Sequence, residues 1–154
     1  MLQDLYRNLV ISHDKYRKNN GMLDGENVQK VHYKNPTCGD VITLYLRIEN
    51  EIVQDVSFEG EGCSISMASS SMMTELIKNR DVETISTYRD SFEQLIRHGE
   101  KPVDNIDLGD ALALEGVHKL RARHNCALMA WQALDKILDD GEAYRKRKEV
   151  VKSI

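Results

Sequence analysis

The sequence predicts a single α+β domain in which a small antiparallel sheet of about three strands is covered by helices. Segments with strand-like patterns fall before residue 61, whereas most of the later chain has helical spacing. The 154 residues are enough to enclose one hydrophobic core. Because no repeat or linker divides the chain, we expect one domain over residues 1–154, with about residues 142–154 as a basic tail or helix end.

The first predicted element is an amphipathic helix over residues 1 to about 18, where apolar side chains recur every three or four positions. Asn19-Asn20-Gly21 is typical of a helix end. A polar stretch follows, and we expect a short strand near Val28 to Tyr33.

Two strands are predicted next, as an antiparallel pair. Residues 41–48 alternate between apolar and polar side chains, which is typical of a half-buried strand. The turn signal Glu49-Asn50-Glu51 separates them from a second strand, which Ile52, Val56 and Phe58 mark.

Helical patterns occupy the rest of the chain. We expect a helix to begin just after Cys63, capped by Ser64 or Ser66. Further helices are predicted by apolar spacing and by flanking cap residues. They cover Val82 to His98, with Asp81 and Gly99 at its two ends, Asn105 to Leu120, and about Arg123 to Asp140.

Composition excludes several classes of protein. A content of 41% hydrophobic residues with a net charge of −4 argues against disorder, and the longest apolar run, Cys126 to Trp131, is too short to span a membrane. The sequence pI of about 5.7 and the 6% aromatic content argue against nucleic-acid binding. No secretory signal is recognised, so we expect a cytoplasmic protein. The basic cluster Arg145–Lys148 is typical of a solvated helix end.

The three cysteines carry the clearest chemical signal. Cys38 is in a predicted loop, Cys63 follows a strand, and Cys126 begins a helix. Asp40 adds a carboxylate near the first of them. Thiolates with a carboxylate suit Zn²⁺ or an iron–sulfur cluster. No CxxC pair is present, so the fold would have to assemble such a site, and three unrelated cysteines remain an alternative.

Three motifs show a resemblance to a known family. They are Asn35-Pro-Thr-Cys-Gly-Asp40, Phe58-Glu-Gly-Glu-Gly-Cys-Ser-Ile-Ser-Met-Ala-Ser69 and Arg121-Ala-Arg-His-Asn-Cys-Ala-Leu128. They resemble the U-type iron–sulfur cluster assembly proteins, and within these the SufU branch of Gram-positive bacteria. The resemblance implies an IscU/NifU-N-like fold. Asn125 stands where the IscU type has histidine, and Lys119-Leu-Arg-Ala-Arg123 replaces its proline-rich chaperone motif, so docking to a dedicated Hsp70 is not implied.

The resemblance also implies a site and partners. The metal ligands would be Cys38, Asp40, Cys63 and Cys126, with Zn²⁺ as the metal. Cys38 would accept sulfur from a PLP-dependent, SufS-type cysteine desulfurase, which the protein would activate. Other implied partners are Suf cluster-assembly proteins and apo iron–sulfur targets.

Charge adds two candidate neighbours of this site. Thiolates and a carboxylate around Zn²⁺ leave a net negative charge, which favours nearby hydrogen-bond donors. Arg123 lies three residues before Cys126, on the same side of a helix, and is one candidate. His124 is the other, as a neighbour of the ligands rather than as a ligand.

Three functions are therefore open. The first is a zinc-bound sulfur acceptor, at most a sulfurtransferase in enzymatic terms. The second is a scaffold on which a [2Fe–2S] or [4Fe–4S] cluster is assembled by the same ligands, with iron in place of zinc. The third is a zinc-stabilised interaction module without transfer chemistry. A hydrolase or deaminase is not expected, because the chain contains neither HExxH nor HxE with PCxxC.

Overall fold

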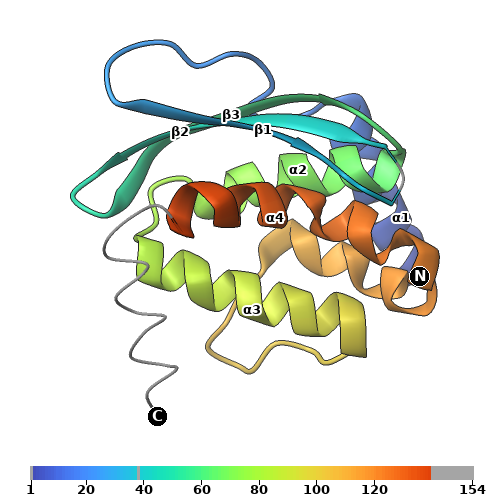
Figure 1. The fold of residues 1–154 in the computed structure, drawn as a ribbon. Coiled ribbons are helices and arrows are strands. Elements are labelled where there is room, and N and C mark those ends of the chain that lie inside the picture. Colours follow the sequence, from blue (N-terminus) through green and yellow to red (C-terminus); the bar gives the residue numbers. More distant parts are fainter. Residues whose placement is uncertain (1, 38, 140–154) are drawn as a thin grey trace.

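A computed structural model describes residues 2–37 and 39–139. It shows a sheet lying over a layer of helices (Figure 1). The elements are, in order, α1 (Leu2–Lys15), β1 (Val28–Lys34), β2 (Val41–Glu49), β3 (Ile52–Glu61), α2 (Ser64–Ile77), α3 (Val82–His98), the 3₁₀ helices η1 (Gly109–Lys119) and η2 (Arg121–Arg123), and α4 (His124–Asp139). The predicted α+β class is confirmed.

The sheet has three antiparallel strands in the order β1-β2-β3. A two-residue turn joins β2 to β3, and both of its residues, Asn50 and Glu51, have positive φ angles of 53° and 64°. Such a turn matches the right-handed twist of paired strands, so it fixes their register. As predicted, the apolar residues of one face of β2 are buried, since Ile42, Leu44 and Leu46 are fully enclosed.

Helices α2 and α4 lie side by side beneath the sheet, and α3 lies below α4 (Figure 1). Helix α2 is buried on nearly all sides, and its buried residues include Ser66, Ser69, Ser70, Ser71 and Thr74. Small hydroxyl side chains let neighbouring helices approach closely, and each buried hydroxyl then needs a hydrogen-bond partner. Helix α2 thus contributes both apolar side chains and hydrogen-bonding hydroxyl groups to the interior of the protein.

The predicted helix over residues 1 to about 18 ends earlier than expected, at Lys15. After this point the chain runs beside β3. The amide of Phe58 donates to the carbonyl of Asn19 at 3.0 Å, and the amide of Gly21 donates to the carbonyl of Phe58 at 2.8 Å. The strand edge therefore competes with the helix for these backbone groups, and the helix stops.

The predicted helix over residues 105–120 is a 3₁₀ helix that begins at Gly109. Its buried residues Ala111, Leu114 and Val117 recur every three positions. A helix with three residues per turn places such residues in one row, so tertiary packing favours the 3₁₀ form here.

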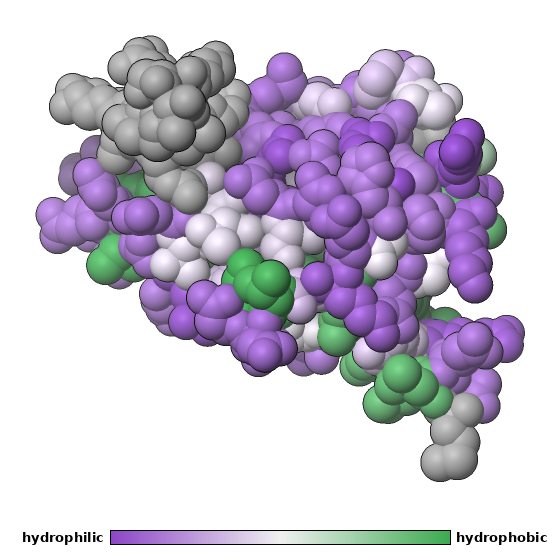
Figure 2. Space-filling model, turned by 90° about the horizontal axis from the view of Figure 1, so that it is seen from below, coloured by the Kyte–Doolittle hydropathy of each residue, from purple (hydrophilic) through white to green (hydrophobic). Residues whose placement is uncertain are grey.

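The outer face of the helical layer is mostly hydrophilic, with scattered hydrophobic groups (Figure 2). Among the described residues, no helix is long and apolar enough to cross a membrane. The basic cluster Arg145–Lys148 lies outside the described residues.

Candidate metal centre

Asp40 and Cys63 lie together because of the register of one strand pair. Val41, the first residue of β2, lies opposite Glu61, the last residue of β3. One step beyond each strand, the chain reaches Asp40 on one side and Gly62 and Cys63 on the other. The sheet therefore brings together two residues that lie far apart in the sequence.

Cys126 reaches the same end of the sheet on the first turn of α4. Two hydrogen bonds from other elements fix this helix. The hydroxyl of Ser69 donates to the carbonyl oxygen of Ala127 at 2.6 Å, and the hydroxyl of Tyr33 donates to Oε1 of Gln132 at 2.9 Å. Helix α4 is thus bound to both α2 and β1, which sets the position of its first turn.

Asp40, Cys63 and Cys126 form a compact cluster of potential metal ligands. One carboxylate oxygen and the two sulfur atoms all lie within 4.8 Å of one another. In a tetrahedral zinc site with metal–ligand distances of ~2.3 Å, the ligand atoms lie about 3.8 Å apart. Small movements would therefore bring all three atoms within bonding distance of one ion. Cys126 is buried, whereas Asp40 and Cys63 are half-buried. The donor set fits zinc, for which two sulfurs and a carboxylate oxygen are suitable ligands.

The N-cap of α2 is Cys63 itself, so the predicted caps Ser64 and Ser66 were wrong. The sulfur atom of Cys63 accepts a hydrogen bond from the backbone amide of Ser66 at 3.5 Å. The helix begins one residue after the cysteine, and the third amide of the helix points back at the sulfur. This is the usual position of a cap acceptor, here taken by sulfur in place of oxygen.

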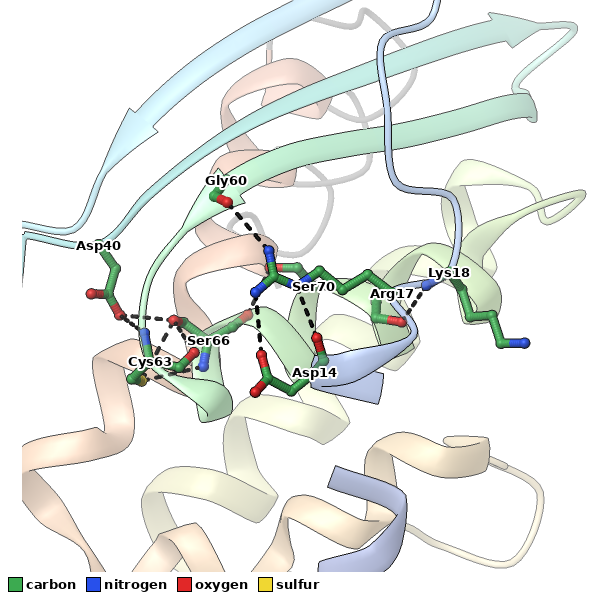
Figure 3. Close-up of polar contacts among 9 residues, drawn as sticks. Asp14, Arg17, Lys18, Asp40, Gly60, Cys63, Ser66 and Ser70 are labelled. Carbon is green, nitrogen blue, oxygen red and sulfur yellow. Dashed lines mark hydrogen bonds and ion pairs between the residues drawn. The ribbon is translucent and has the colours of Figure 1, made fainter. Parts of the chain in front are cut away.

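The sequence predicts Ser66 only as a possible cap, whereas the structure places its hydroxyl beside Asp40. Its hydroxyl donates to Oδ2 of Asp40 at 2.8 Å, and the backbone amide of Cys63 donates to the same oxygen at 3.3 Å (Figure 3). The start of α2 thus holds Asp40 with two donors. The three-residue spacing from Cys63 to Ser66 is the spacing of a capping box, which was the available signal in the sequence.

Gly62 leaves room for these contacts. A Cβ atom on residue 62 would lie 2.5 Å from Oγ of Ser66 and 2.7 Å from Cγ of Asp40. Real side chains do not tolerate such distances, so the carboxylate and the hydroxyl occupy the space that any other residue at this position would fill.

Cys38 lies outside the described residues, but its flanking chain is defined. The amide of Asn35 donates to the carbonyl of Asp40 at 2.7 Å, and Oδ1 of Asn35 accepts from the amide of Thr37 at 3.0 Å. Nδ2 of Asn125 donates to Oγ1 of Thr37 at 2.8 Å. These bonds tie the chain on either side of residue 38 to the start of α4.

The two predicted neighbours of the site, Arg123 and His124, lie at the end of η2 and at the start of α4. Arg123 is exposed at the end of η2. Nε2 of His124 lies 2.8 Å from the carbonyl oxygen of His118, and the two rings stack with centroids 6.2 Å apart. These contacts hold the chain before Cys126, and the roles of Arg123 and His124 towards a metal stay predictions.

The family model that describes the NifU-like N terminal domain matches residues 5–140. The chain belongs to this family. The predicted resemblance to U-type iron–sulfur cluster assembly proteins is therefore confirmed. The match covers the whole sheet and all three cysteines.

Two relatives of this NifU-like chain span nearly its full length. The "Zinc-dependent sulfurtransferase SufU" of Bacillus subtilis is 47% identical over 135 residues, which cover 88% of this chain and 90% of the relative. The "Iron-sulfur cluster assembly scaffold protein IscU" of Streptococcus pyogenes is 39% identical over 137 residues, with 89% and 84% covered.

Solved structures share the fold. The crystal structure of a hypothetical protein superposes with a TM-score of 0.80 at 39% identity and covers 86% of this chain and 96% of its own. The NifU-like N-terminal protein of Brucella abortus has a TM-score of 0.77, covers 88% and 93%, and at 22% identity supports the fold alone. The IscU/NifU-N-like architecture is thus confirmed.

Proposed function

We propose that this protein is a zinc-bound sulfur acceptor of iron–sulfur cluster biogenesis. It receives persulfide sulfur from a PLP-dependent, SufS-type cysteine desulfurase and activates that enzyme. The observation that carries the proposal is the cluster of Asp40, Cys63 and Cys126, whose ligand atoms lie within 4.8 Å of one another. The similarity to a zinc-dependent sulfurtransferase supports the same function.

The proposed ligands are Cys38, Asp40, Cys63 and Cys126. Zinc, when bound, supplies a centre without redox chemistry whose ligands exchange readily. The chain supplies the rest of the site. Ser66 and the amide of Cys63 donate to Asp40, and the amide of Ser66 donates to the sulfur of Cys63, so hydrogen-bond donors face the negative charge of the ligand set.

The proposed transfer is an exchange of sulfur between two cysteines. The thiolate of Cys38 attacks the terminal sulfur of the desulfurase persulfide. A new S–S bond forms on Cys38, the S–S bond on the desulfurase breaks, and the desulfurase cysteine leaves as a thiolate that takes up a proton. No net oxidation or reduction occurs, and the rate depends on access and on the thiolate fraction of the attacking group.

Mass spectrometry of the protein after incubation with a cysteine desulfurase and cysteine tests this proposal. We expect one additional sulfur atom on Cys38, and no addition when cysteine is omitted. The variant Cys38→Ser should accept no sulfur and should no longer stimulate the desulfurase. Unchanged stimulation by Cys38→Ser would contradict the acceptor function and favour an interaction module.

A scaffold function is the second candidate, because the Streptococcus pyogenes relative is named an assembly scaffold and the same ligands suit iron. The assembled cluster would then pass to other Suf proteins and to apo iron–sulfur targets. Protein purified without oxygen distinguishes the two functions. Colourless protein that contains zinc supports the acceptor, whereas brown protein with charge-transfer absorption supports the scaffold.

A further inference from the structure

The hydroxyl of Ser66 lies between two of the proposed ligands. The side chain is fully buried, on the first turn of α2. Its oxygen lies 2.8 Å from Oδ2 of Asp40, 3.0 Å from the carbonyl oxygen of Cys63 and 3.5 Å from the sulfur of Cys63 (Figure 3). One hydroxyl therefore contacts the carboxylate ligand and one thiol ligand together.

The single proton of this hydroxyl goes to Asp40. A hydroxyl donates one hydrogen bond, and three potential acceptors surround it. The carboxylate oxygen is the closest of the three, and a charged acceptor forms the stronger bond. The backbone carbonyl and the sulfur of Cys63 are therefore the weaker contacts.

Two donors thus converge on one oxygen of Asp40, because the amide of Cys63 also donates to Oδ2. A carboxylate oxygen has about two lone-pair positions for hydrogen bonds. Ligation of a metal through the other oxygen is the arrangement that keeps both bonds. A single-oxygen carboxylate ligand suits a four-coordinate zinc site, whereas a bidentate carboxylate would raise the coordination number.

We propose that Ser66 is a positioning residue of the metal centre, which holds Asp40 in the orientation for single-oxygen ligation of zinc. This inference rests on the proposed zinc site and adds a residue to it. Ser66 acts on the metal only through Asp40. Its loss should therefore weaken zinc binding in a way that depends on the presence of the Asp40 carboxylate.

The first test compares Ser66→Ala with Ser70→Ala. Ser70 is a matched control because it is also fully buried on α2, but its hydroxyl donates to the backbone carbonyl of Ser66. Zinc affinity is measured by competition with a chromogenic chelator. We expect Ser66→Ala to bind zinc roughly 10- to 100-fold more weakly, and Ser70→Ala to bind zinc as tightly as the wild type does.

The absorption spectrum of the cobalt-substituted protein gives a second readout. The Ser66→Ala variant should show weaker d–d absorption than the wild type, because the tetrahedral geometry is lost.

The second test is a double-mutant cycle with Asp40→Ala. If Ser66 acts through the carboxylate, Ser66→Ala should cause no further loss of zinc affinity once Asp40 has been removed. An equal loss in both backgrounds would show a merely structural effect and would overturn the inference. Wild-type affinity and an unchanged cobalt spectrum in Ser66→Ala would overturn it as well.

A third test uses two variants of similar shape, which controls for effects of Ser66 substitutions on folding and on side-chain volume. Ser66→Thr and Ser66→Val have nearly the same shape, but only threonine keeps the hydroxyl. We expect the threonine variant to bind zinc more tightly than the valine variant, and equal affinities would contradict the inference.

The outcomes for Ser66 and for the proposed function are separable. A wild-type protein that binds zinc but accepts no sulfur would remove the proposed function and leave the role of Ser66 standing. A wild-type protein that accepts sulfur, together with a Ser66→Ala variant that binds zinc normally, would overturn only the role of Ser66. A wild-type protein that binds no zinc would overturn both.

Discussion

At the scale of single residues, the candidate site depends on one glycine. Gly62 lies between the end of β3 and the start of α2. Among the described glycines, it is the only one at which a Cβ atom would meet the carboxylate of Asp40 and the hydroxyl of Ser66. The missing side chain of Gly62 therefore leaves room for the contact between Asp40 and Ser66.

We predict that Gly62→Ala weakens zinc binding by about 10-fold or more, because the new methyl group displaces the orienting contacts. Chelator competition measures the effect. Gly116→Ala is the matched control, since a Cβ atom at Gly116 meets nothing within 4 Å. Equal zinc affinity in the two variants would show that the space beside Asp40 is unimportant.

The sequence predicts that the cysteines lie at element junctions, and this holds for Cys63 and Cys126. The cap of α2 by a sulfur atom is not predicted, because serine is the commoner cap and two serines follow Cys63. The contacts of His13 are not predicted either. Its partners Ser71 and Asp110 lie far away in the sequence, and no local pattern contains them.

At the scale of elements, His13 joins three helices. The buried ring contacts Oγ of Ser71 on α2 at 2.7 Å and Oδ2 of Asp110 on η1 at 2.9 Å. A carboxylate only accepts, so Nε2 of a neutral His13 carries the proton, and Nδ1 accepts from the hydroxyl of Ser71. The hydroxyl oxygen in turn accepts from the amide of Lys18 at 2.8 Å. The chain of bonds connects α1 to the rest of the molecule.

We predict that His13→Leu lowers the free energy of unfolding by about 1–3 kcal/mol, because Ser71 loses a buried partner. Urea denaturation measures this value. His32→Leu serves as the control, since His32 is exposed and should change stability by no more than about 0.5 kcal/mol. A His13 variant as stable as its control would contradict the role of these bonds.

Helix α3 gives a prediction that depends on pH. Asp81 caps this helix by accepting from the amide of Thr84 at 3.2 Å. A hydrogen bond from the side chain of Thr84 is the main reason that the pKa of Asp81 lies below its ordinary value. A lowered folded-state pKa means that the ionised cap stabilises the fold above the unfolded-state pKa and loses this effect as pH falls through the folded-state pKa.

Asp81→Ala should therefore lower the free energy of unfolding by about 1 kcal/mol at neutral pH. The difference from the wild type should narrow as the pH falls through the lowered pKa of Asp81. Urea denaturation at a series of pH values measures both effects. A difference that stays constant down to the lowest pH would show that the charge of Asp81 does not matter.

Helices α3 and η1 show where sequence patterns succeed and fail. Both ends of α3 follow from local signals, since Asp81 caps its start and Gly99 ends it with a φ angle of 69°. The 3₁₀ form of η1 follows from packing against α1, α2 and α3. Sequence alone predicts an element well where its caps decide it, and poorly where its neighbours do.

At the scale of the whole molecule, the proposed metal connects parts of the chain that the sheet and α4 bring together. Asp40, Cys63 and Cys126 belong to three separate segments. A ligand that binds only the folded protein stabilises it, and the stabilisation grows with the ratio of free ligand to dissociation constant. Metal removal should therefore lower stability as well as activity.

We predict that a chelator lowers the melting temperature of the zinc-loaded protein by about 10 °C, which corresponds to about 4 kcal/mol for a ligand present at roughly 1,000 times its dissociation constant. Differential scanning calorimetry measures the shift. The chelator should leave the melting temperature of Cys126→Ser unchanged. An identical melt of the wild type with and without chelator would mean that the site is peripheral to the fold or empty.

The zinc content of the purified protein and of its cysteine variants tests the proposed metal site most directly. We expect about one zinc ion per chain in the wild type and in Ser70→Ala, and a large loss of zinc in Cys63→Ser and Cys126→Ser. A wild-type protein without bound zinc, or cysteine variants that keep their full zinc content, would contradict the proposed metal site.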